Sequence, residues 1–179
     1  CLHAAVWSLI ESLGDNQDAL AMVDWPRCMR LVSHRCSTSD PWFPWTVGVP
    51  DRDGNTALME MIRNHPDPCA ALEVIEAHAH ACNVAHVNHK GQTALLLACD
   101  DWFDEVLVKL IETFGADCNA GQVDNNGNTT LIEACRFNDT RIVTKLIETF
   151  GDACMPGHAN NYGNTALMVA IDPSYHYGS

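Results

Sequence analysis

Apolar residues recur with the spacing of an amphipathic helix and then stop at a glycine. One such set falls at i, i+1, i+4, i+5 and i+8: Val106, Leu107, Leu110, Ile111 and Phe114. This spacing places the apolar side chains on one face of a helix. The next residue, Gly115, can adopt the left-handed backbone conformation that ends many helices. The pattern therefore predicts a helix with one buried face that ends before Gly115.

The same short sequence motifs recur at regular intervals. The phrase Leu-Ile-Glu-Thr-Phe-Gly occupies residues 110–115 and 146–151, and a variant of it occupies residues 9–14. A second phrase, Gly-x-Thr-x-Leu, begins at Gly54, Gly91, Gly127 and Gly163. A fixed interval of this size is the sequence signature of a stack of similar structural units.

Each unit is predicted to run in the order turn, helix, turn, helix. The glycine of the second phrase suits a tight turn, and the threonine two residues later can cap the amino end of a short helix. These short helices are predicted to end near Met61, Ala98, Ala134 and Ala170. The regular units are expected over residues 51–172, divided as 51–87, 88–123, 124–159 and a partial unit 160–172.

Both ends of the sequence differ from the regular units. Residues 1–50 predict degenerate units, in which 1–14 form a second helix without a first and Trp42–Trp45 lie in an enlarged loop. That aromatic loop either packs as a cap or offers an exposed anchor to a partner. After the last short helix, residues 173–179 are predicted to be a C-terminal tail. Ends that fall inside a unit predict either a segment of a longer array or ends that dock on another protein.

The repeated phrases resemble the ankyrin repeat over residues 51–172. The resemblance implies an all-α fold, an ankyrin-repeat solenoid of stacked helix–turn–helix units with hairpin fingers. It also implies a non-enzymatic module that binds a protein partner. The unit is about three residues longer than the ~33 of the family, which affects loop geometry rather than the fold. The wording is also similar to ankyrin arrays that are common in giant amoeba-infecting viruses, so such a source is an expectation.

Charge and composition limit the classes of partner and the cellular compartment that we expect. The chain has 10 Lys and Arg against 23 Asp and Glu, a net charge of −13 that repels nucleic acid. No stretch approaches the ~18–20 apolar residues of a membrane span, so no membrane partner is expected. The nine cysteines are odd in number. Cys82, Cys118 and Cys154 follow the repeat interval, so they should lie too far apart for disulfides. We expect a cytoplasmic or other reducing intracellular compartment.

A crowded group of histidines raises the question of a metal. It consists of His78, His80, Cys82, His86 and His89. These residue types bind zinc, but the repeat explains much of the group, because Cys82 corresponds to Cys118 and His86 to His158. We expect no metal, no cofactor, no small-molecule substrate and no enzymatic activity, since no nucleophile has an evident orienting partner. Asn83 and Asn119 either hydrogen-bond in a turn or accept the asparagine hydroxylation known in ankyrin families.

Positions that differ between units, and that we expect to be exposed, are the candidates for contacting a partner. In the ankyrin family the finger tips and the residues after the first helix line the concave groove. The finger-tip candidates are Arg52, Asp53, His89, Lys90, Asn125, Asn126, Asn161 and Tyr162. The candidates after the first helix are Arg63, Asp100, Asp101, Arg136 and Phe137. The acidic run from Asp100 to Glu105 either favours the positive end of the next helix or attracts a basic partner.

Two functions remain open at this point. The leading hypothesis is a protein–protein interaction module that binds through the groove and finger tips. The alternative is a structural element of a larger assembly, docked through its uncapped ends. On the leading hypothesis, Phe137→Ala and Tyr162→Ala should weaken a complex with little loss of stability. Leu131→Ala, at a predicted core position, should destabilise the fold by ~2–5 kcal/mol.

Overall fold

The computed structural model describes residues 48–64, 68–100 and 104–175, and every structural statement below concerns these residues. Of the degenerate units predicted over residues 1–50, residues 1–47 with the Trp42–Trp45 loop lie outside them. The α-helices are α5 (Ala57–Asn64), α6 (Cys69–His78), α7 (Ala94–Asp100), α8 (Asp104–Phe114), α9 (Thr130–Arg136), α10 (Thr140–Phe150) and α11 (Ala166–Ile171). The short 3₁₀ helices are η1 (Ala79–Ala81), η2 (Gly115–Cys118), η3 (Gly151–Cys154) and η4 (Pro173–Tyr175).

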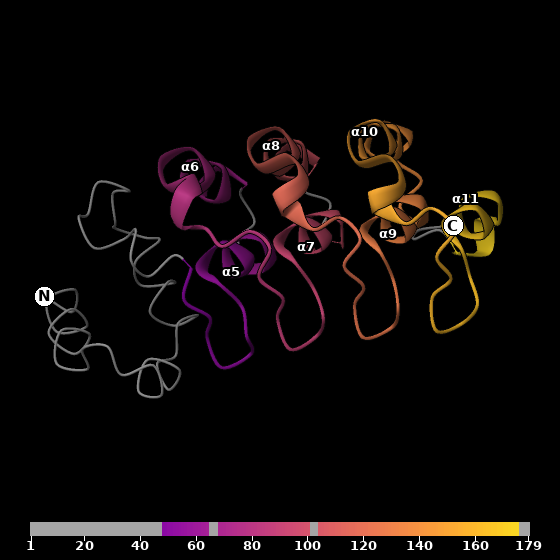
Figure 1. Ribbon diagram of the computed structural model, residues 1–179, viewed down its shortest axis with the longest axis horizontal. Coiled ribbons are helices and arrows are strands. Elements are labelled where there is room, and N and C mark those ends of the chain that lie inside the picture. The colour runs from indigo at the N-terminus through magenta and orange to yellow at the C-terminus, as the bar shows by residue number, and fades with distance from the viewer. Residues whose placement is uncertain (1–47, 65–67, 101–103, 176–179) are drawn as a thin grey trace, which may run out of the picture.

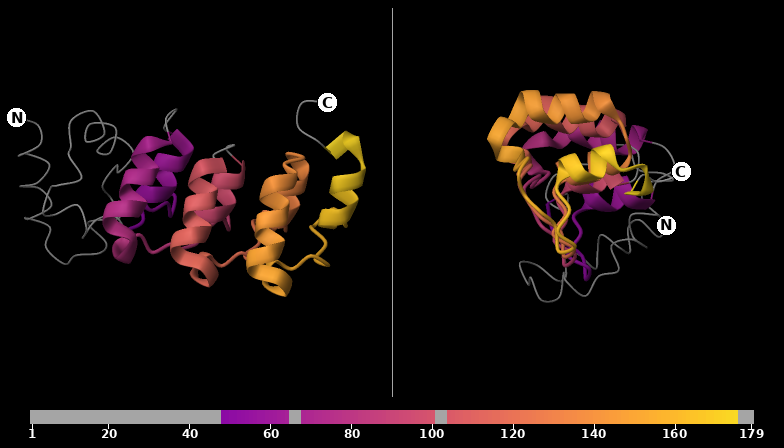
Figure 2. Two further views of the ribbon diagram at one scale, coloured as in Figure 1. Left: turned by 90° about the horizontal axis from the view of Figure 1, so that it is seen from above. Right: turned by 90° about the vertical axis from the view of Figure 1, so that its right-hand side faces the viewer.

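The helices form two parallel rows, as Figure 1 shows. The first helices of the units, α5, α7, α9 and α11, make one row in which each packs on the next. The second helices, α6, α8 and α10, make the other row. Figure 2 shows the helix pairs stacked side by side along the long axis. This arrangement confirms the predicted all-α solenoid of helix–turn–helix units.

A hairpin loop precedes each first helix and projects away from the second helices (Figure 1). We call these loops fingers 1 to 4, and they cover residues 50–56, 87–93, 123–129 and 159–165. Fingers 3 and 4 each close with an isolated antiparallel bridge, Val123 with Thr129 and Ala159 with Thr165. The described residues contain no longer β-strand.

The capping threonines lie where the sequence predicts them. Each hydroxyl oxygen accepts a hydrogen bond from the backbone N–H three residues on. The pairs are Thr56 with Met59, Thr93 with Leu96, Thr129 with Ile132 and Thr165 with Met168, at 3.2–3.4 Å. Each oxygen thereby satisfies a donor that the first turn of a helix leaves without an intrahelical partner.

The first helices extend one to three residues further than predicted. They end at Asn64, Asp100, Arg136 and Ile171 rather than near Met61, Ala98, Ala134 and Ala170. In α9 the reason is visible, since the N–H of Phe137 still donates to the carbonyl of Glu133 at 3.2 Å. Asn138 then adopts a left-handed conformation with φ 56°, and this turn leads into the next helix.

The second helices α8 and α10 end at the predicted glycines. Gly115 (φ 50°) and Gly151 (φ 49°) both have positive φ, and each starts a 3₁₀ turn. The residue after each of these turns is left-handed: Asn119 (φ 52°) and Met155 (φ 52°). Asn83 (φ 44°) is the equivalent residue of unit 1, since it follows Cys82 as Asn119 follows Cys118. Because a methionine occupies this position in one unit, the turn requires a backbone conformation rather than the amide of asparagine.

The core is a continuous apolar strip between the two rows of helices. Its largest fully buried side chains include Leu58, Leu95, Leu107, Leu110, Leu131 and Leu146. Cys82, Cys118 and Cys154 are buried along this strip as thiols, not disulfides. The Cys118 thiol donates to the carbonyl of Leu110 at 3.3 Å, and burial raises its pKa to about 12. These cysteines therefore serve as small core residues with little thiolate character.

Two adjacent threonines in unit 3 should have opposite effects when the hydroxyl is removed. Thr129 caps α9, whereas the hydroxyl of the fully buried Thr130 has no hydrogen-bond partner among the described residues. Thr130→Val keeps the volume and removes an unsatisfied buried group, so it should raise the free energy of unfolding by ~1 kcal/mol. Thr129→Val removes the cap and should lower it by ~1 kcal/mol. Urea denaturation measures both, and equal signs would contradict the assignment.

Candidate partner-binding surface

The four fingers share one set of backbone hydrogen bonds. In each, the side-chain Oδ1 of an Asp or Asn accepts hydrogen bonds from the N–H groups two and four residues on, at 2.7–3.0 Å. The accepting residues are Asp51, Asn88, Asp124 and Asn160. The N–H of the finger glycine also donates back to the carbonyl of this residue. The side chain thus replaces a longer strand ladder and fixes the turn.

The glycines of fingers 1 to 3 are required by conformation and by space. Gly127 has φ 78°, where only glycine is comfortable. A Cβ atom there would lie 2.7 Å from the side-chain oxygen of Asn161 in the next finger and 2.9 Å from its backbone nitrogen. Successive fingers therefore lie backbone against backbone, which keeps their tips in register.

Four side chains of different chemistry stand at one equivalent position of this frame. Asp53, Lys90, Asn126 and Tyr162 each donate the backbone N–H to the same finger oxygen, and all four side chains are exposed. Tyr162 is 73% exposed although it is a large aromatic residue. The backbone is constant at this position and the chemistry varies, so we call these four residues the tip row.

The residues one position before the tip row fall into two groups. Arg52, His89, Asn125 and Asn161 are all exposed. The Asn125 amide donates to the carbonyl of His89 at 3.1 Å, and the Asn161 amide donates to the carbonyl of Asn125 at 3.0 Å. These two asparagines therefore join neighbouring fingers. The 36-residue interval between them is the signal in the sequence that could have indicated this role.

Buried polar residues connect the fingers to the first helices in alternate units. The Asn88 amide donates to Asn55 at 2.7 Å, and the Asn55 amide donates to Glu60 on α5 at 2.7 Å. The same chain recurs from Asn160 to Asn128 to Glu133 on α9, at 2.8 and 2.7 Å. All six residues are buried. Sequence reasoning missed these polar chains, although a glutamate in an otherwise apolar helix, at Glu60 and Glu133, was a visible signal.

The arginines predicted to contact a partner from the first helices pair with these glutamates. Arg63 lies 3.7 Å from Glu60 and remains exposed. Arg136 lies 3.0 Å from Glu133, and its side chain is only 19% exposed. Since Glu133 is buried, Arg136 compensates its charge. The expectation of an exposed side chain is therefore wrong for Arg136.

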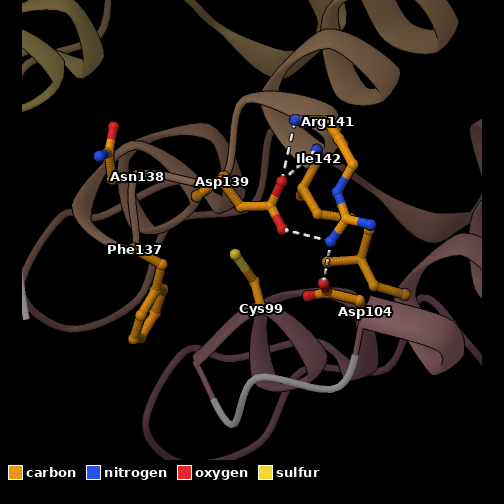
Figure 3. A pocket seen from close by; sticks show the side chains of 9 residues that line it. Cys99, Asp104, Phe137, Asn138, Asp139, Arg141 and Ile142 are labelled. Atoms are coloured by element: carbon orange, nitrogen blue, oxygen red, sulfur yellow. Dashed lines mark hydrogen bonds and ion pairs between the residues drawn. The ribbon is translucent and has the colours of Figure 1, made fainter.

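Phe137 is half-buried and packs against the apolar core, so the expectation that it is exposed is also wrong. It lines a cavity of about 320 Å³ between α7–α8 and α9–α10, shown in Figure 3. Cys99 also lines this cavity, as do Asp104 and Asp139. The side chain of Phe137 thus belongs to the packing between units 2 and 3.

Two carboxylates and an arginine hold the edge of this cavity. Arg141 donates to Asp104 at 3.0 Å and to Asp139 at 3.2 Å (Figure 3). Asp139 caps α10 by accepting from the N–H groups of Arg141 and Ile142. Burial raises the pKa of Asp104, and the neighbouring Asp139 raises it further. Burial acts in the same direction on Asp139, but the hydrogen bonds from Arg141 and Ile142 outweigh it and lower the pKa of Asp139.

The acidic run divides between a helix end and undescribed residues. Asp104 and Glu105 occupy the first turn of α8, where a negative charge is favourable. Asp100 is the last residue of α7, and Asp101 lies outside the described residues.

The histidine group is spread over different parts of units 1 and 2. His86 Nε2 bonds the carbonyl of Gly54 at 2.8 Å, and His158 Nε2 bonds the carbonyl of Gly127 at 2.9 Å in the same way. His78 is buried in α6, whereas His80 and His89 are exposed. Among the described residues, no three His, Cys, Asp or Glu side chains gather as a metal site would require. The repeat thus explains His86 as a residue that binds the preceding finger.

The buried polar chain offers a matched test of its energetic role. Asn128→Ala removes one hydrogen-bond partner from the buried Glu133 and one from the buried Asn160. It should therefore lower the free energy of unfolding by ~2–4 kcal/mol. Asn164→Ala at the equivalent position of finger 4 removes one exposed bond from Tyr175 and should cost less than ~0.5 kcal/mol. Equal losses in chemical denaturation would disprove the role of the chain.

Phe137 provides a second stability test. Phe137→Ala removes a half-buried ring from between units and should lower the free energy of unfolding by ~1–3 kcal/mol. Tyr162→Ala, at an exposed ring, should change it by less than ~0.5 kcal/mol. Thermal and urea unfolding of the two variants measure the difference, which would be absent if Phe137 were a surface residue.

Comparison with known proteins supports the repeat assignment. Residues 103–176 match the family described as ankyrin repeats (3 copies). A search among curated proteins gives no match to the sequence. The family match falls on units that share the finger bonds, capping threonines and paired helices described above. Within residues 103–176 the chain is therefore similar to ankyrin repeats.

Proposed function

We propose that this chain binds a protein partner through the groove formed by the fingers and the first helices. Ankyrin repeats are in general protein–protein interaction modules, and they are typically non-enzymatic. The groove and the finger tips as the contact surface are our proposal. We also propose that no catalytic step is involved.

The tip row is the observation that carries this proposal. Asp53, Lys90, Asn126 and Tyr162 differ in charge and size, although the same finger bonds hold their backbones. If the fingers served only to stack, as Asn125 and Asn161 do, the tips would need no such variety. Tyr162 is suited to be an anchor, since exposed tyrosines supply large contact area and are enriched among residues that dominate binding energy.

The charge of the chain favours a basic surface on the partner. The net charge of −13 gives the molecule an acidic field that speeds encounter with a positive partner. The tip row is mixed in sign, with Asp53 and Lys90 in neighbouring fingers, so it can fix the register of the complex.

A second function is favoured by one specific observation. The last first helix, α11, exposes Leu167 and Ile171, at 69% and 72%. Such a surface suits contact with a further unit of the same array or with a neighbouring protein. We therefore retain, as the second proposal, a structural element that docks through the end of the stack.

Crosslinking in native material, followed by mass spectrometry, can identify the partner, with crosslinks expected at Lys90. With the purified partner, Tyr162→Ala should weaken the complex by ~2 kcal/mol, about thirtyfold in Kd. Asp53→Lys should slow association with a basic partner and reduce the dependence of the rate on salt. Isothermal titration calorimetry and stopped-flow mixing measure these effects.

The control substitution lies at the other candidate surface. Glu148 is exposed and lies on the second helix α10 rather than in a finger, so Glu148→Lys should leave this affinity unchanged. If Glu148→Lys changes the affinity and the tip-row substitutions do not, the groove proposal is wrong and the second proposal stands.

A further inference from the structure

Equivalent positions of the first helices carry charges of alternating sign. The residue seven positions after the capping threonine is Arg63 in α5, Asp100 in α7 and Arg136 in α9. We call these three residues the floor row, because they lie on the first helices that form the floor of the proposed groove. The sign of the charge at this position therefore changes from each unit to the next along the groove.

The alternation is accompanied by a difference in the buried residues. Three positions before the floor row, units 1 and 3 have the buried Glu60 and Glu133, whereas unit 2 has the buried Leu97. Arg63 lies 3.7 Å from Glu60 and Arg136 lies 3.0 Å from Glu133, and the arginine side chains keep 31% and 19% of their surface exposed. The sign of each charge is thus tied to the interior of its own unit.

The arginines of the floor row are suited to hold a second carboxylate while they keep the first. A guanidinium group has five N–H donors. Arg136 contacts both side-chain oxygens of Glu133 through the single nitrogen Nη1, at 3.0 Å. Arg141 shows such double use in this chain, since its Nη2 donates to Asp104 at 3.0 Å and to Asp139 at 3.2 Å. A carboxylate from a partner would therefore add to the pair of glutamate and arginine in units 1 and 3.

The interval between successive units determines which conformation of a bound segment fits the floor row. The first helices pack on one another, and neighbouring helices lie ~8–10 Å apart. A polyproline II segment has three residues per turn and rises ~3.1 Å per residue, so every third side chain returns to the same face after ~9.3 Å. In a β-strand, by contrast, residues i and i+3 point to opposite sides. A polyproline II segment therefore matches the units with one turn per unit.

We propose that the groove binds a polyproline II segment of a partner protein in which every third residue is charged, in the order acidic, basic, acidic. The proposal rests on the proposed groove function and names the partner chemistry of that site. The two acidic residues would pair with Arg63 and Arg136, and the basic residue would pair with Asp100. Proline-rich segments adopt this conformation before they bind, so less conformational entropy is lost in the complex.

The test uses the whole chain and a synthetic peptide with Glu, Lys and Glu at every third position and proline at all others. Isothermal titration calorimetry should give a Kd of about 100 µM or tighter. A peptide with Lys, Glu and Lys in the same places should bind at least about tenfold more weakly, because three attractive pairs become repulsive. The net charge of −13 would attract this second peptide more strongly than the first. Nonspecific attraction therefore predicts the opposite order of affinity.

A third peptide tests the spacing of the charges. It carries Glu, Lys and Glu at every second position in the same proline background, so its composition of charges is unchanged. Its charged side chains no longer share one face of the polyproline II helix. It should therefore bind at least about tenfold more weakly than the first peptide.

A charge exchange tests the pairing at unit 2. Asp100→Lys should weaken binding of the first peptide several-fold, and a peptide with Glu at all three places should bind this variant better than the original chain. Lysine is favoured at the last position of a helix such as α7, so the variant should fold, and its melting temperature checks this. Glu148→Lys makes the same change of charge on α10 and should alter neither affinity by more than about twofold.

Equal binding of the first two peptides, or binding of neither, overturns the proposal. Equal effects of Asp100→Lys and Glu148→Lys also overturn it, since the peptide would then respond to the net charge of the chain. The peptide comparisons decide the question even if Asp100→Lys fails to fold. The proposed groove function is tested separately, because Tyr162→Ala should still weaken the native complex if the groove binds a segment of other chemistry.

Discussion

No unit of this protein can bury its apolar surface alone, and the rest of the structure follows from that constraint. A first helix such as α7 is buried only because α5 and α9 lie on either side of it and α8 covers it. Each unit therefore packs one face against the unit before it and one against the unit after it. Among the described residues, the surface left over is the finger tips, one edge of the second helices and the face of α11.

The fingers also depend on their neighbours, but through polar contacts. A loop that projects from a helix row has backbone groups that need partners, and a single side-chain oxygen in each finger accepts two of its N–H groups. The next finger supplies further bonds, for instance from the N–H of Asn161 to the carbonyl of Asn126 at 2.9 Å. A rigid frame of this kind lets a residue such as Tyr162 vary without effect on the frame. Stability and recognition are thus carried by different atoms of one loop.

The repeat made much of the fold predictable from the sequence, whereas the candidate surface was less predictable. The capping threonines and the glycines at 115 and 151 were predictable because each has a local backbone role that reads directly from one or two residues. The half-buried state of Arg136 and Phe137 was not predictable from the pattern, because Arg136 pairs with the buried Glu133 and Phe137 packs against the neighbouring unit. Variation between units therefore identified true surface positions at the tip row, but it also selected residues whose variation reflects different packing.

The buried polar chains give this array a period of two units instead of one. Asn55 and Asn128 accept from the amides of Asn88 and Asn160, whereas Asp124, which follows the second unit, has no amide to donate. Loss of the single unit 88–123 would bring Asn55 against Asp124 and leave a buried acceptor facing a carboxylate. Loss of the two units 88–159 would bring Asn55 against Asn160 and preserve the bond. The array is therefore free to lengthen or shorten by pairs of units, and resists change by one.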